Sequence, residues 1–289
     1  MMTEIPNMDQ MLRMALQEDV GEGDHSTVAC IPPTAIGSAK MVAKESGIVC
    51  GVEVAKRVFE LANEIYYHTL IPMRVLVAKN DGEAVEKGEI IMYVTGPTDA
   101  TLTGERTALN YMQRMSGIAT QTHKMVQMLA GCHTQLLDTR KTTPNMRMLE
   151  KYAVKCGGGT NHRIGLYDMV MLKDNHIDFA GGIEEAIERT QGYLKNQGKE
   201  LKIEIEVRDM QELERVLAHG GVDRIMLDNF DVEGLRRAVE RIGGRYETEA
   251  SGGITEQTLR QYAQTGVDYI SVGALTHHIK SLDISLVRF

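Results

Sequence analysis

The chain has 289 residues, of which 43% are hydrophobic, and a formal net charge of -8 at pH 7. This length suits one large domain or two ordinary ones with a sizeable buried core. Acidic and basic residues are spread along the whole chain, which argues against a general nucleic-acid or membrane surface, so any anion site has to be a local cluster of cations.

The four cysteines, Cys30, Cys50, Cys132 and Cys156, are scattered along the sequence. They lack the close pairs of zinc or redox motifs and the density of a disulfide-rich secreted domain. The first 20 residues lack the apolar region of a signal peptide, and no stretch is apolar and long enough to span a bilayer. We therefore expect a soluble protein in the reducing cytoplasm.

The N-terminal third has the texture of a compact α+β unit. Apolar residues at helical spacing predict a helix over 9–18, and a loop rich in glycine and acidic residues follows it. Short apolar runs between turn signals then predict strands at 39–43, 73–78 and 90–95, with a helix near 52–61.

The character of the sequence changes near Thr103. A helical segment over 105–128 is followed by a repeated alternation of a short apolar run, a polar or glycine-rich loop and a helical pattern. The apolar runs lie at 136–137, 170–172, 203–207, 225–227, 248–250 and 269–272. Such alternation predicts parallel strands with crossover helices, in a (β/α) barrel or an open version of one.

In barrels of this kind the chemistry lies at the carboxyl ends of the strands. The residues that follow the apolar runs are therefore the candidates: 138–141 (DTRK), 173–176 (KDNH), Glu206, 228–229 (DN), 251–253 (SGG) and Gly273. Together they predict one site with several cations, two carboxylates and two loops of small residues.

The cations Arg140, Lys141, Arg163 and Lys173 are either solvated charges in ion pairs or parts of an anion site. Their position directly after apolar strands favours the anion site, since Arg recognises carboxylate or phosphate in a bidentate way and Lys acts as a point charge. Glu206 is either a helix cap or local ion-pair partner, or a ligand for a divalent cation or sugar hydroxyls. Both readings also apply to Asp228.

Three glycine-containing loops complete the candidate site. The segments 251–253 (SGG) and 271–273 (SVG) each close a strand just before a helix, where bare backbone N–H groups favour a phosphate. The consecutive glycines of 156–163 (CGGGTNHR) allow an unusual backbone path that directs His162 and Arg163 inward, although a merely flexible loop is the simpler reading.

Seven segments together resemble the signature segments of the quinolinate phosphoribosyltransferases in order and wording, and the resemblance runs nearly end to end. They are 105–110 (ERTALN), 137–144 (LDTRKTTP), 156–163 (CGGGTNHR), 172–176 (LKDNH), 225–229 (IMLDN), 249–254 (EASGGI) and 271–276 (SVGALT). Small departures occur at Gly104, at His278 and at an apparent one-residue insertion at 220–221, and none removes a charged group.

The resemblance implies an α/β protein with an N-terminal α+β sandwich domain, residues 1–112, and an open (β/α) barrel, residues 113–275, that carries phosphate-binding loops at its strand ends. Residues 276–289 would pack back on the N-terminal domain. Two chains would form a homodimer in which each N-terminal domain covers the partner's barrel, and further assembly of dimers into hexamers stays open.

The resemblance also implies the reaction, which joins quinolinate to the ribose of phosphoribosyl pyrophosphate with loss of CO2 and yields nicotinate mononucleotide for NAD biosynthesis. The expected catalytic residues are Lys141, Lys173, Glu206 and Asp228, and Mg²⁺ is the expected cofactor. The groups that would hold the quinolinate carboxylates and the pyrophosphate are Arg140, Lys141, His162, Arg163, Lys173 and, from the neighbouring subunit, Arg106, with Thr139 in the same set. Glu206 and Asp228 would face Mg²⁺ and the ribose hydroxyls, and the loops Ser251-Gly252-Gly253 and Ser271-Val272-Gly273 would take the 5-phosphate.

Three other functions compete with this one. A phosphoribosyltransferase-like protein associated with molybdenum transport shares the fold, but the intact set of cations disfavours it. A barrel aldolase would use Lys173 as a Schiff-base amine, which borohydride would trap. A non-catalytic binding protein would not need both carboxylates beside an anion site.

Overall fold

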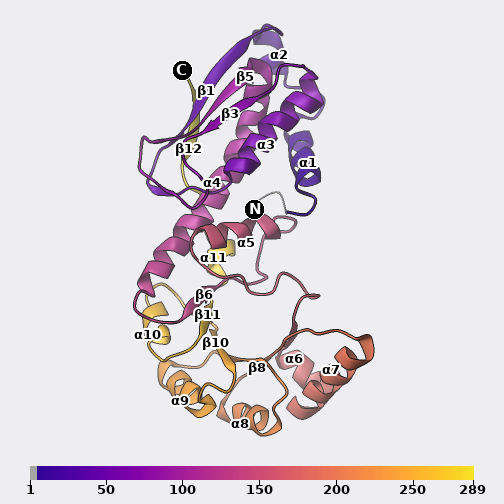
Figure 1. Cartoon of the computed structure of the whole chain (residues 1–289), viewed down its shortest axis with the longest axis vertical. Helices are drawn as coiled ribbons and strands as arrows, with labels where there is room; N and C mark the ends of the chain where they lie inside the picture. Colours follow the sequence, from indigo (N-terminus) through magenta and orange to yellow (C-terminus); the bar gives the residue numbers. More distant parts are fainter. Residues whose placement is uncertain (1–4) are drawn as a thin grey trace. The chain divides into compact units, whose positions relative to one another are not determined.

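The computed structural model of the protein describes residues 5–289, which fold as two compact units (Figure 1). The first unit takes in the chain up to His123, together with Thr143–Gly158 and Thr276–Phe289. The second unit consists of Lys124–Thr142 and Gly159–Leu275. The second unit is therefore formed by two internal segments of the chain. The segment between them and the segment after them belong to the first unit.

The first unit contains a four-stranded antiparallel sheet with the strand order β12-β1-β5-β3 and a two-stranded pair, β2-β4. The strands are β1 (Ile36–Ala43), β2 (Gly47–Ile48), β3 (Arg74–Val77), β4 (Ala84–Val85), β5 (Ile90–Pro97) and β12 (Ile284–Arg288). The helices are α1 (Met8–Val20), α2 (His25–Cys30), α3 (Val52–Ala62), the π-helical turn η2 (Asn63–Tyr67), α4 (Thr98–Met128, in this unit up to His123), α5 (Arg147–Cys156) and α11 (Ala274–His277, which begins in the second unit).

The sheet of the first unit has one face on the core, and its edge strand β12 comes from the C-terminal end of the chain. In β1 the buried residues Ala39, Met41 and Ala43 alternate with more exposed ones, as expected for a strand with one face on the core. β12 pairs with β1 from Ala39 opposite Arg288 to Ala43 opposite Ile284. The last strand of the chain thus completes one edge of a sheet whose other strands lie in the first hundred residues.

The second unit contains a six-stranded parallel sheet with the order β6-β11-β10-β9-β8-β7. The strands are β6 (Gln135–Leu137), β7 (Val170–Leu172), β8 (Ile203–Val207), β9 (Arg224–Asp228), β10 (Glu247–Ser251) and β11 (Tyr269–Ser271). Within the described residues no strand pairing joins β6 to β7, so the sheet is open. The predicted α/β class, with an N-terminal α+β part and a parallel-sheet part, is confirmed.

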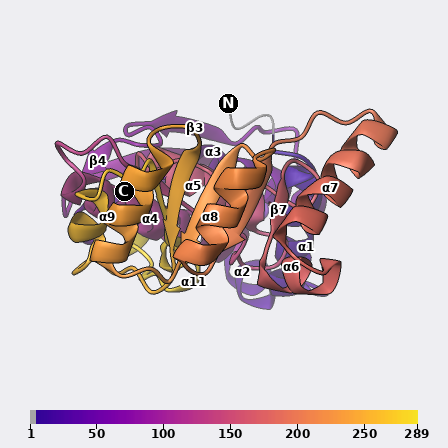
Figure 2. The same ribbon diagram turned by 90° about the horizontal axis from the view of Figure 1, so that it is seen from below.

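Helices cover the sheet of the second unit (Figure 2). They are α6 (Asp174–Ala180), α7 (Ile183–Gln197), α8 (Met210–His219), α9 (Val232–Ile242) and α10 (Leu259–Ala263), and successive helices contact one another. All five residues of β8 are buried, as expected for a parallel strand covered on both faces. The carboxylate of Asp209 caps α8 and that of Asp231 caps α9 by accepting backbone N–H groups of the first turn. These caps set the residue at which each of the two helices begins.

None of the helices among residues 5–289 is long and apolar enough to cross a membrane.

Candidate active site

Lys173, Glu206 and Asp228 come together at the carboxyl ends of three adjacent strands of the second unit. Lys173 follows β7, Glu206 lies in β8 and Asp228 ends β9. The Nζ atom of Lys173 donates a hydrogen bond of 2.8 Å to Oε2 of Glu206. Burial raises the pKa of Asp228, the negative charge of Glu206 raises it further, and the ammonium of Lys173 acts against both. The two carboxylates and the ammonium thus form one electrostatically connected group.

Arg140 and Arg163 form a second cationic group in the same unit. Arg140 is exposed and follows β6, whereas Arg163 is half-buried and donates from Nη1 to the carbonyl oxygen of Met169 at 3.1 Å. Burial lowers the pKa of Arg163, and the positive charge of Arg140 lowers it further. Two guanidinium groups that repel each other in this way are favourably placed for an anion that lies between them.

His162, the residue before Arg163, is buried, with 7% of its surface exposed. Its Nε2 atom lies 3.0 Å from Oε2 of Glu204 and 3.2 Å from Oε2 of Glu249. Arg224 lies on β9, between the strands that carry Glu204 and Glu249, and its Nη1 atom is 3.3 Å from Oε2 of Glu249. The backbone N–H of His162 donates to Oδ1 of the fully buried Asp138 at 2.9 Å, so both the backbone and the ring of His162 are fixed.

The protons of this buried cluster can be placed from its contacts. Burial lowers the pKa of His162, but hydrogen bonds to Glu204 and Glu249 outweigh it and raise the pKa to about 9. Nδ1 of His162 nevertheless accepts a hydrogen bond of 2.6 Å from the backbone N–H of Arg163, so Nδ1 carries no proton. Burial and the charge of Glu249 raise the pKa of Glu204. We therefore place the additional proton on Glu204, which leaves the cluster with the same total charge as a protonated histidine would.

With that proton, the cluster is close to neutral: Glu249 is negative, Arg224 is positive, and His162 and Glu204 are uncharged. Hydrogen bonds from His162 and the charge of Arg224 lower the pKa of Glu249, although burial acts in the opposite direction. Neutrality explains how two glutamates with no exposed surface are accommodated in the interior.

The loops after β10 and β11 provide the small residues of the site. Gly252 has a φ of +97°, and a Cβ atom there would lie 2.1 Å from Oδ1 of Asn229 and 2.9 Å from its backbone nitrogen. Gly253 has a φ of +62° and open space where a Cβ would be. Only glycine fits the first position, and the second leaves room for a ligand to approach the backbone. Ser271, the last residue of β11, is buried and lowers the pKa of Glu249 by hydrogen bonding.

The other predicted site residues are distributed as follows. Thr139 and Lys141 lie in the loop after β6, where Oγ1 of Thr139 accepts a hydrogen bond of 3.0 Å from the backbone N–H of Lys141. Val272 and Gly273 follow β11, and the backbone N–H of Val272 donates to the carbonyl of Leu137 at 3.0 Å. Arg106 is exposed on α4 in the first unit, whereas all the other predicted site residues belong to the second.

Three charged residues of this buried cluster, Glu204, Arg224 and Glu249, were not among the predicted site residues. A signal for two of them exists in the sequence. Glu204 lies two residues before Glu206, and Glu249 lies two residues before Ser251, so strand periodicity places each pair on one face of the sheet. A charged residue on the inner face of a buried strand needs a partner, and His162 provides it for both.

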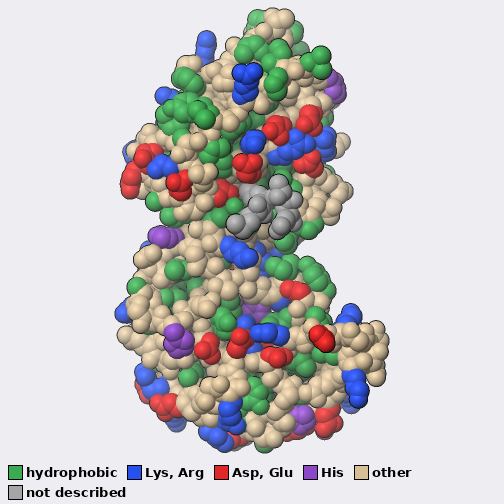
Figure 3. All heavy atoms as spheres, viewed as in Figure 1, with side chains coloured by type: hydrophobic (Ala, Val, Ile, Leu, Met, Phe, Trp, Pro, Cys, Tyr) green, Lys and Arg blue, Asp and Glu red, His purple; other side chains and the backbone are tan. Residues whose placement is uncertain are grey.

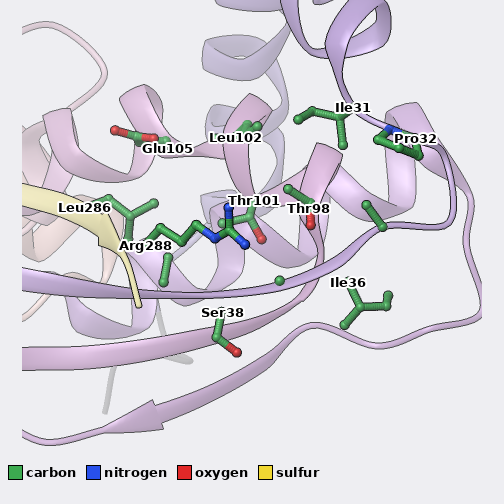
Figure 4. A pocket seen from close by; sticks show the side chains of 13 residues that line it. Ile31, Pro32, Ile36, Ser38, Thr98, Thr101, Leu102, Glu105, Leu286 and Arg288 are labelled. Carbon is green, nitrogen blue, oxygen red and sulfur yellow. The ribbon is translucent and has the colours of Figure 1, made fainter.

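A separate hollow of about 350 Å³ lies in the first unit (Figure 4). Its lining includes Ile36, Leu102, Leu286, Glu105 and Arg288, and Arg288 extends from β12 toward α4 across it. Burial raises the pKa of Glu105. The lining is largely apolar and holds a single cation, so it does not suit a substrate with several negative charges.

On the face shown in Figure 3, basic and acidic side chains are interspersed over the surface.

A parallel α/β sheet with cations, carboxylates and glycine loops at its strand ends defines a class of protein that binds small polyanions. The chain matches the family described as "Quinolinate phosphoribosyl transferase, N-terminal domain" over residues 24–116 and the one described as "Quinolinate phosphoribosyl transferase, C-terminal domain" over residues 118–287. The chain therefore belongs to the quinolinate phosphoribosyltransferase family.

Relatives and solved structures agree with this assignment. The chain is 43% identical to the "Nicotinate-nucleotide pyrophosphorylase [carboxylating], chloroplastic" of Arabidopsis thaliana, with 97% of this chain and 82% of that protein covered. It is 42% identical to the "Probable nicotinate-nucleotide pyrophosphorylase [carboxylating]" of Bacillus subtilis, with 96% and 92% covered. NadC from Streptococcus pyogenes superposes with a TM-score of 0.90 at 38% identity, covering 98% of this chain and 97% of that one.

Proposed function

We propose that the protein transfers the phosphoribosyl group of phosphoribosyl pyrophosphate to the ring nitrogen of quinolinate and releases CO2, pyrophosphate and nicotinate mononucleotide. Membership of the family and near full-length relatives with this activity in their names support the reaction. The observation that carries it in this chain is the grouping of Arg140 and Arg163 with Lys173, Glu206 and Asp228 in one unit.

Quinolinate carries two ring carboxylates, and phosphoribosyl pyrophosphate carries a pyrophosphate and a 5-phosphate, so the site has to offer cations in more than one place. We assign the ring carboxylates to Arg140 and Arg163, because their mutual repulsion is relieved by an anion between them. Lys173, with Lys141 assisting, would neutralise the pyrophosphate. The glycine loops after β10 and β11 would hold the 5-phosphate, since Gly253 leaves its backbone open to a ligand.

His162 was expected to contact the substrate, but its Nε2 atom points at Glu204 and Glu249. We therefore propose that it acts as a positioning residue. Its Nδ1 atom accepts the backbone N–H of Arg163, so the buried cluster fixes the backbone from which the Arg163 side chain extends.

Glu206 and Asp228 suit Mg²⁺ chemically, because hard cations prefer carboxylate oxygens. The raised pKa of Asp228 reflects like-charge repulsion from Glu206, which a cation would relieve. Lys173 already pairs with Glu206, so Asp228 is the carboxylate whose charge is less neutralised. When bound, Mg²⁺ would neutralise charge on the leaving pyrophosphate.

Displacement of pyrophosphate from the anomeric carbon passes through an oxocarbenium-like state. The negative charges of Glu206 and Asp228 can stabilise the positive ribose, while Lys173 stabilises the leaving group. Attack by the ring nitrogen then creates a pyridinium, which accepts the electron pair left behind when the 2-carboxylate departs as CO2. Positioning and electrostatics therefore account for the chemistry required of the protein.

We further propose that Arg106 reaches the active site of a second copy in a homodimer. Arg106 is exposed on α4 of the first unit, so it is accessible to a neighbouring chain. We propose the cytoplasm as the location of the protein. Because plant relatives are named chloroplastic or mitochondrial, cell fractionation is the experiment that distinguishes these locations.

The reaction is tested by incubating the protein with quinolinate, phosphoribosyl pyrophosphate and Mg²⁺ while nicotinate mononucleotide and CO2 are measured. Nicotinate serves as the matched control substrate, because it lacks the 2-carboxylate and leaves one of the cations unpaired. We expect quinolinate to be strongly preferred in kcat/KM. Equal kcat/KM for both substrates would contradict the assignment of two carboxylate-binding cations.

A further inference from the structure

Two cysteines that are far apart in the sequence meet in the first unit. Cys50 directly precedes the N-cap of α3, and Cys156 is the last residue of α5. The Sγ atoms of both, together with a carboxylate oxygen of Asp81, lie within 4.8 Å of one another. Cys50 is fully buried and Cys156 is half-buried. One thiol is therefore protected from solvent and the other is accessible to small reagents.

The surroundings hold the pair in place. The backbone N–H of Cys50 donates to Oγ of Ser116 at 2.9 Å, and the same hydroxyl donates to the carbonyl of Cys50 at 3.1 Å. Beside Cys156, a Cβ atom on Gly157 would lie 2.4 Å from the carbonyl oxygen of Ala119, so this end of α5 packs directly on α4. Neither cysteine sits in a loose surface loop, and both belong to the same compact unit.

The chemistry of the two thiols differs in the way a reactive pair requires. A hydrogen bond from Cys50 lowers the pKa of Cys156, although burial and the charge of Asp81 act against it. Burial raises the pKa of Cys50 well above its ordinary value. The half-exposed Cys156 is thus the better nucleophile. The buried Cys50 is the thiol positioned to react with an oxidised sulfur on Cys156.

A metal ion is a poorer fit for the same three residues. One oxygen of Asp81 accepts the backbone N–H groups of Gly51 and Val52 at 2.8 and 2.9 Å, and the other accepts the hydroxyl of Tyr152 at 3.0 Å. Both oxygens therefore already satisfy donors at the start of α3 and on α5, and a metal would have to displace them. The two thiols alone are too few ligands for a structural zinc site.

We propose that Cys50 and Cys156 form a reversible disulfide when the protein meets a hydroperoxide. The thiolate sulfur of Cys156 attacks the peroxide, the O–O bond breaks, and a sulfenic acid forms. The departing hydroxide or alkoxide takes up the proton that Cys156 lost on ionisation and leaves as water or an alcohol. The sulfur of Cys50 then attacks that of Cys156, the S–O bond breaks, and the departing hydroxide takes the proton of Cys50 to leave as water. The two thiols supply two electrons, the peroxide accepts them, and a dithiol restores the starting state.

The disulfide would join the last residue of α5 to the residue that precedes the N-cap of α3. Cys156 is followed directly by the three glycines 157–159. Because the two Sγ atoms already lie within 4.8 Å of each other in one compact unit, we expect the cross-link to need only local movement. The oxidised protein should therefore keep its fold and unfold at a higher denaturant concentration than the reduced protein, since the closed loop restricts the unfolded chain.

The test treats the full-length, fully reduced protein with hydrogen peroxide, blocks the remaining thiols, and maps the peptides by mass spectrometry. We expect a linked pair of peptides that contain Cys50 and Cys156, and we expect dithiothreitol to separate them. In Cys50→Ala the sulfenic acid on Cys156 should persist long enough for dimedone to trap it. The matched control Cys132→Ala, at another half-buried cysteine, should leave the cross-link unchanged.

Two results would overturn the proposal. One is oxidation of Cys156 to sulfinic acid in the wild-type protein while Cys50 stays a free thiol. The other is a peroxide-induced rise in the unfolding midpoint that is equal in the wild-type protein and in Cys156→Ala. The second measurement does not require a linked peptide to be recovered, and neither depends on the enzymatic reaction.

Discussion

The ammonium of Lys173 and the carboxylate of Glu206 are 2.8 Å apart, and they link the ends of two neighbouring strands, β7 and β8. The side chain of Glu206 is only 8% exposed, while that of Lys173 is 45% exposed. The pair therefore has a buried acidic partner and a basic partner that solvent and substrate can reach. Removal of the lysine leaves a buried carboxylate beside Asp228 without its nearest counter-charge.

Lys173→Ala should reduce kcat by orders of magnitude while the fold stays intact, because the lysine stabilises charge at the strand ends and adds little to the core. It should also raise the pKa of Asp228, so the acidic limb of the rate profile should move to higher pH. Lys202→Ala is the matched control, since Lys202 is exposed just before β8 at the opposite end of the sheet. Near-normal turnover of Lys173→Ala would show that the lysine is a bystander.

Gly252→Ala should raise KM for phosphoribosyl pyrophosphate and destabilise the protein by about 2 kcal/mol or more, because the new methyl group would collide with Asn229 at a positive φ. Gly244→Ala is the control: Gly244 also has a positive φ, +74°, has open space around it and lies before β10, away from the carboxyl ends of the strands. Its cost should be about 1 kcal/mol, with KM unchanged. Equal effects of the two substitutions on KM would contradict the proposal that the loop at Gly252 binds the 5-phosphate.

The cluster around His162 predicts how stability depends on pH. Hydrogen bonds to Glu204 and Glu249 raise the pKa of His162 from 6.5 to about 9 on folding. Because these groups share one additional proton, which the contacts place on Glu204, the folded cluster as a whole holds that proton more tightly than the unfolded chain does. The contribution, at most about 3 kcal/mol, is fully present below about pH 6.5 and is lost as the pH rises through about 9. Denaturant unfolding between these pH values measures the decline, and a flat stability profile would contradict it.

The variant series isolates the source of that decline. His162→Gln should abolish most of it, whereas His133→Gln, at a side chain that is 62% exposed, should leave it in place. His162→Ala should cost about 3–5 kcal/mol at neutral pH, since it removes the ring N–H that lies between Glu204 and Glu249 and leaves these two buried carboxyl groups without that partner. Its KM for quinolinate should rise more than that for phosphoribosyl pyrophosphate, because His162 holds the backbone of Arg163.

The shared-site proposal can be tested by subunit exchange. Arg106→Ala and Arg163→Ala homodimers should each be nearly inactive, because every site lacks one carboxylate-binding cation. After random exchange about half the dimers are mixed, and in each mixed dimer one site carries both lesions and the other carries neither. Equal mixtures should therefore regain about a quarter of wild-type sites. If activity stays absent although exchange is demonstrated, Arg106 acts within its own chain.

Most strands of the second unit were predictable because they are short runs in which buried apolar residues predominate. The runs at 170–172 and 203–207 coincide with β7 and β8. The strand β12 was not predicted, because its residues change from buried to exposed along its length and its partner β1 is distant in sequence. Helix α4 begins at Thr98, earlier than the predicted 105, since Thr98 follows β5 without an intervening loop.

The site shows the same division. That Lys173, Glu206 and Asp228 would gather follows from parallel strands, whose carboxyl ends share one edge of the sheet. The contact of His162 with Glu204 and Glu249 does not follow, because β10 lies two strands from β8 in an order that the sequence does not reveal. The scattered spacing of Cys50 and Cys156 likewise argued against a thiol pair, yet the fold brings them together.

The pairing of β12 with β1 has a consequence for synthesis on the ribosome. Residues 36–43 emerge early, but their partner, residues 284–288, is translated only after the whole parallel sheet of the second unit. Throughout that interval the nascent chain presents an unpaired strand edge, the kind of surface that templates aggregation. We expect a nascent chain arrested before Ile284 to be the form of this protein that most needs a chaperone.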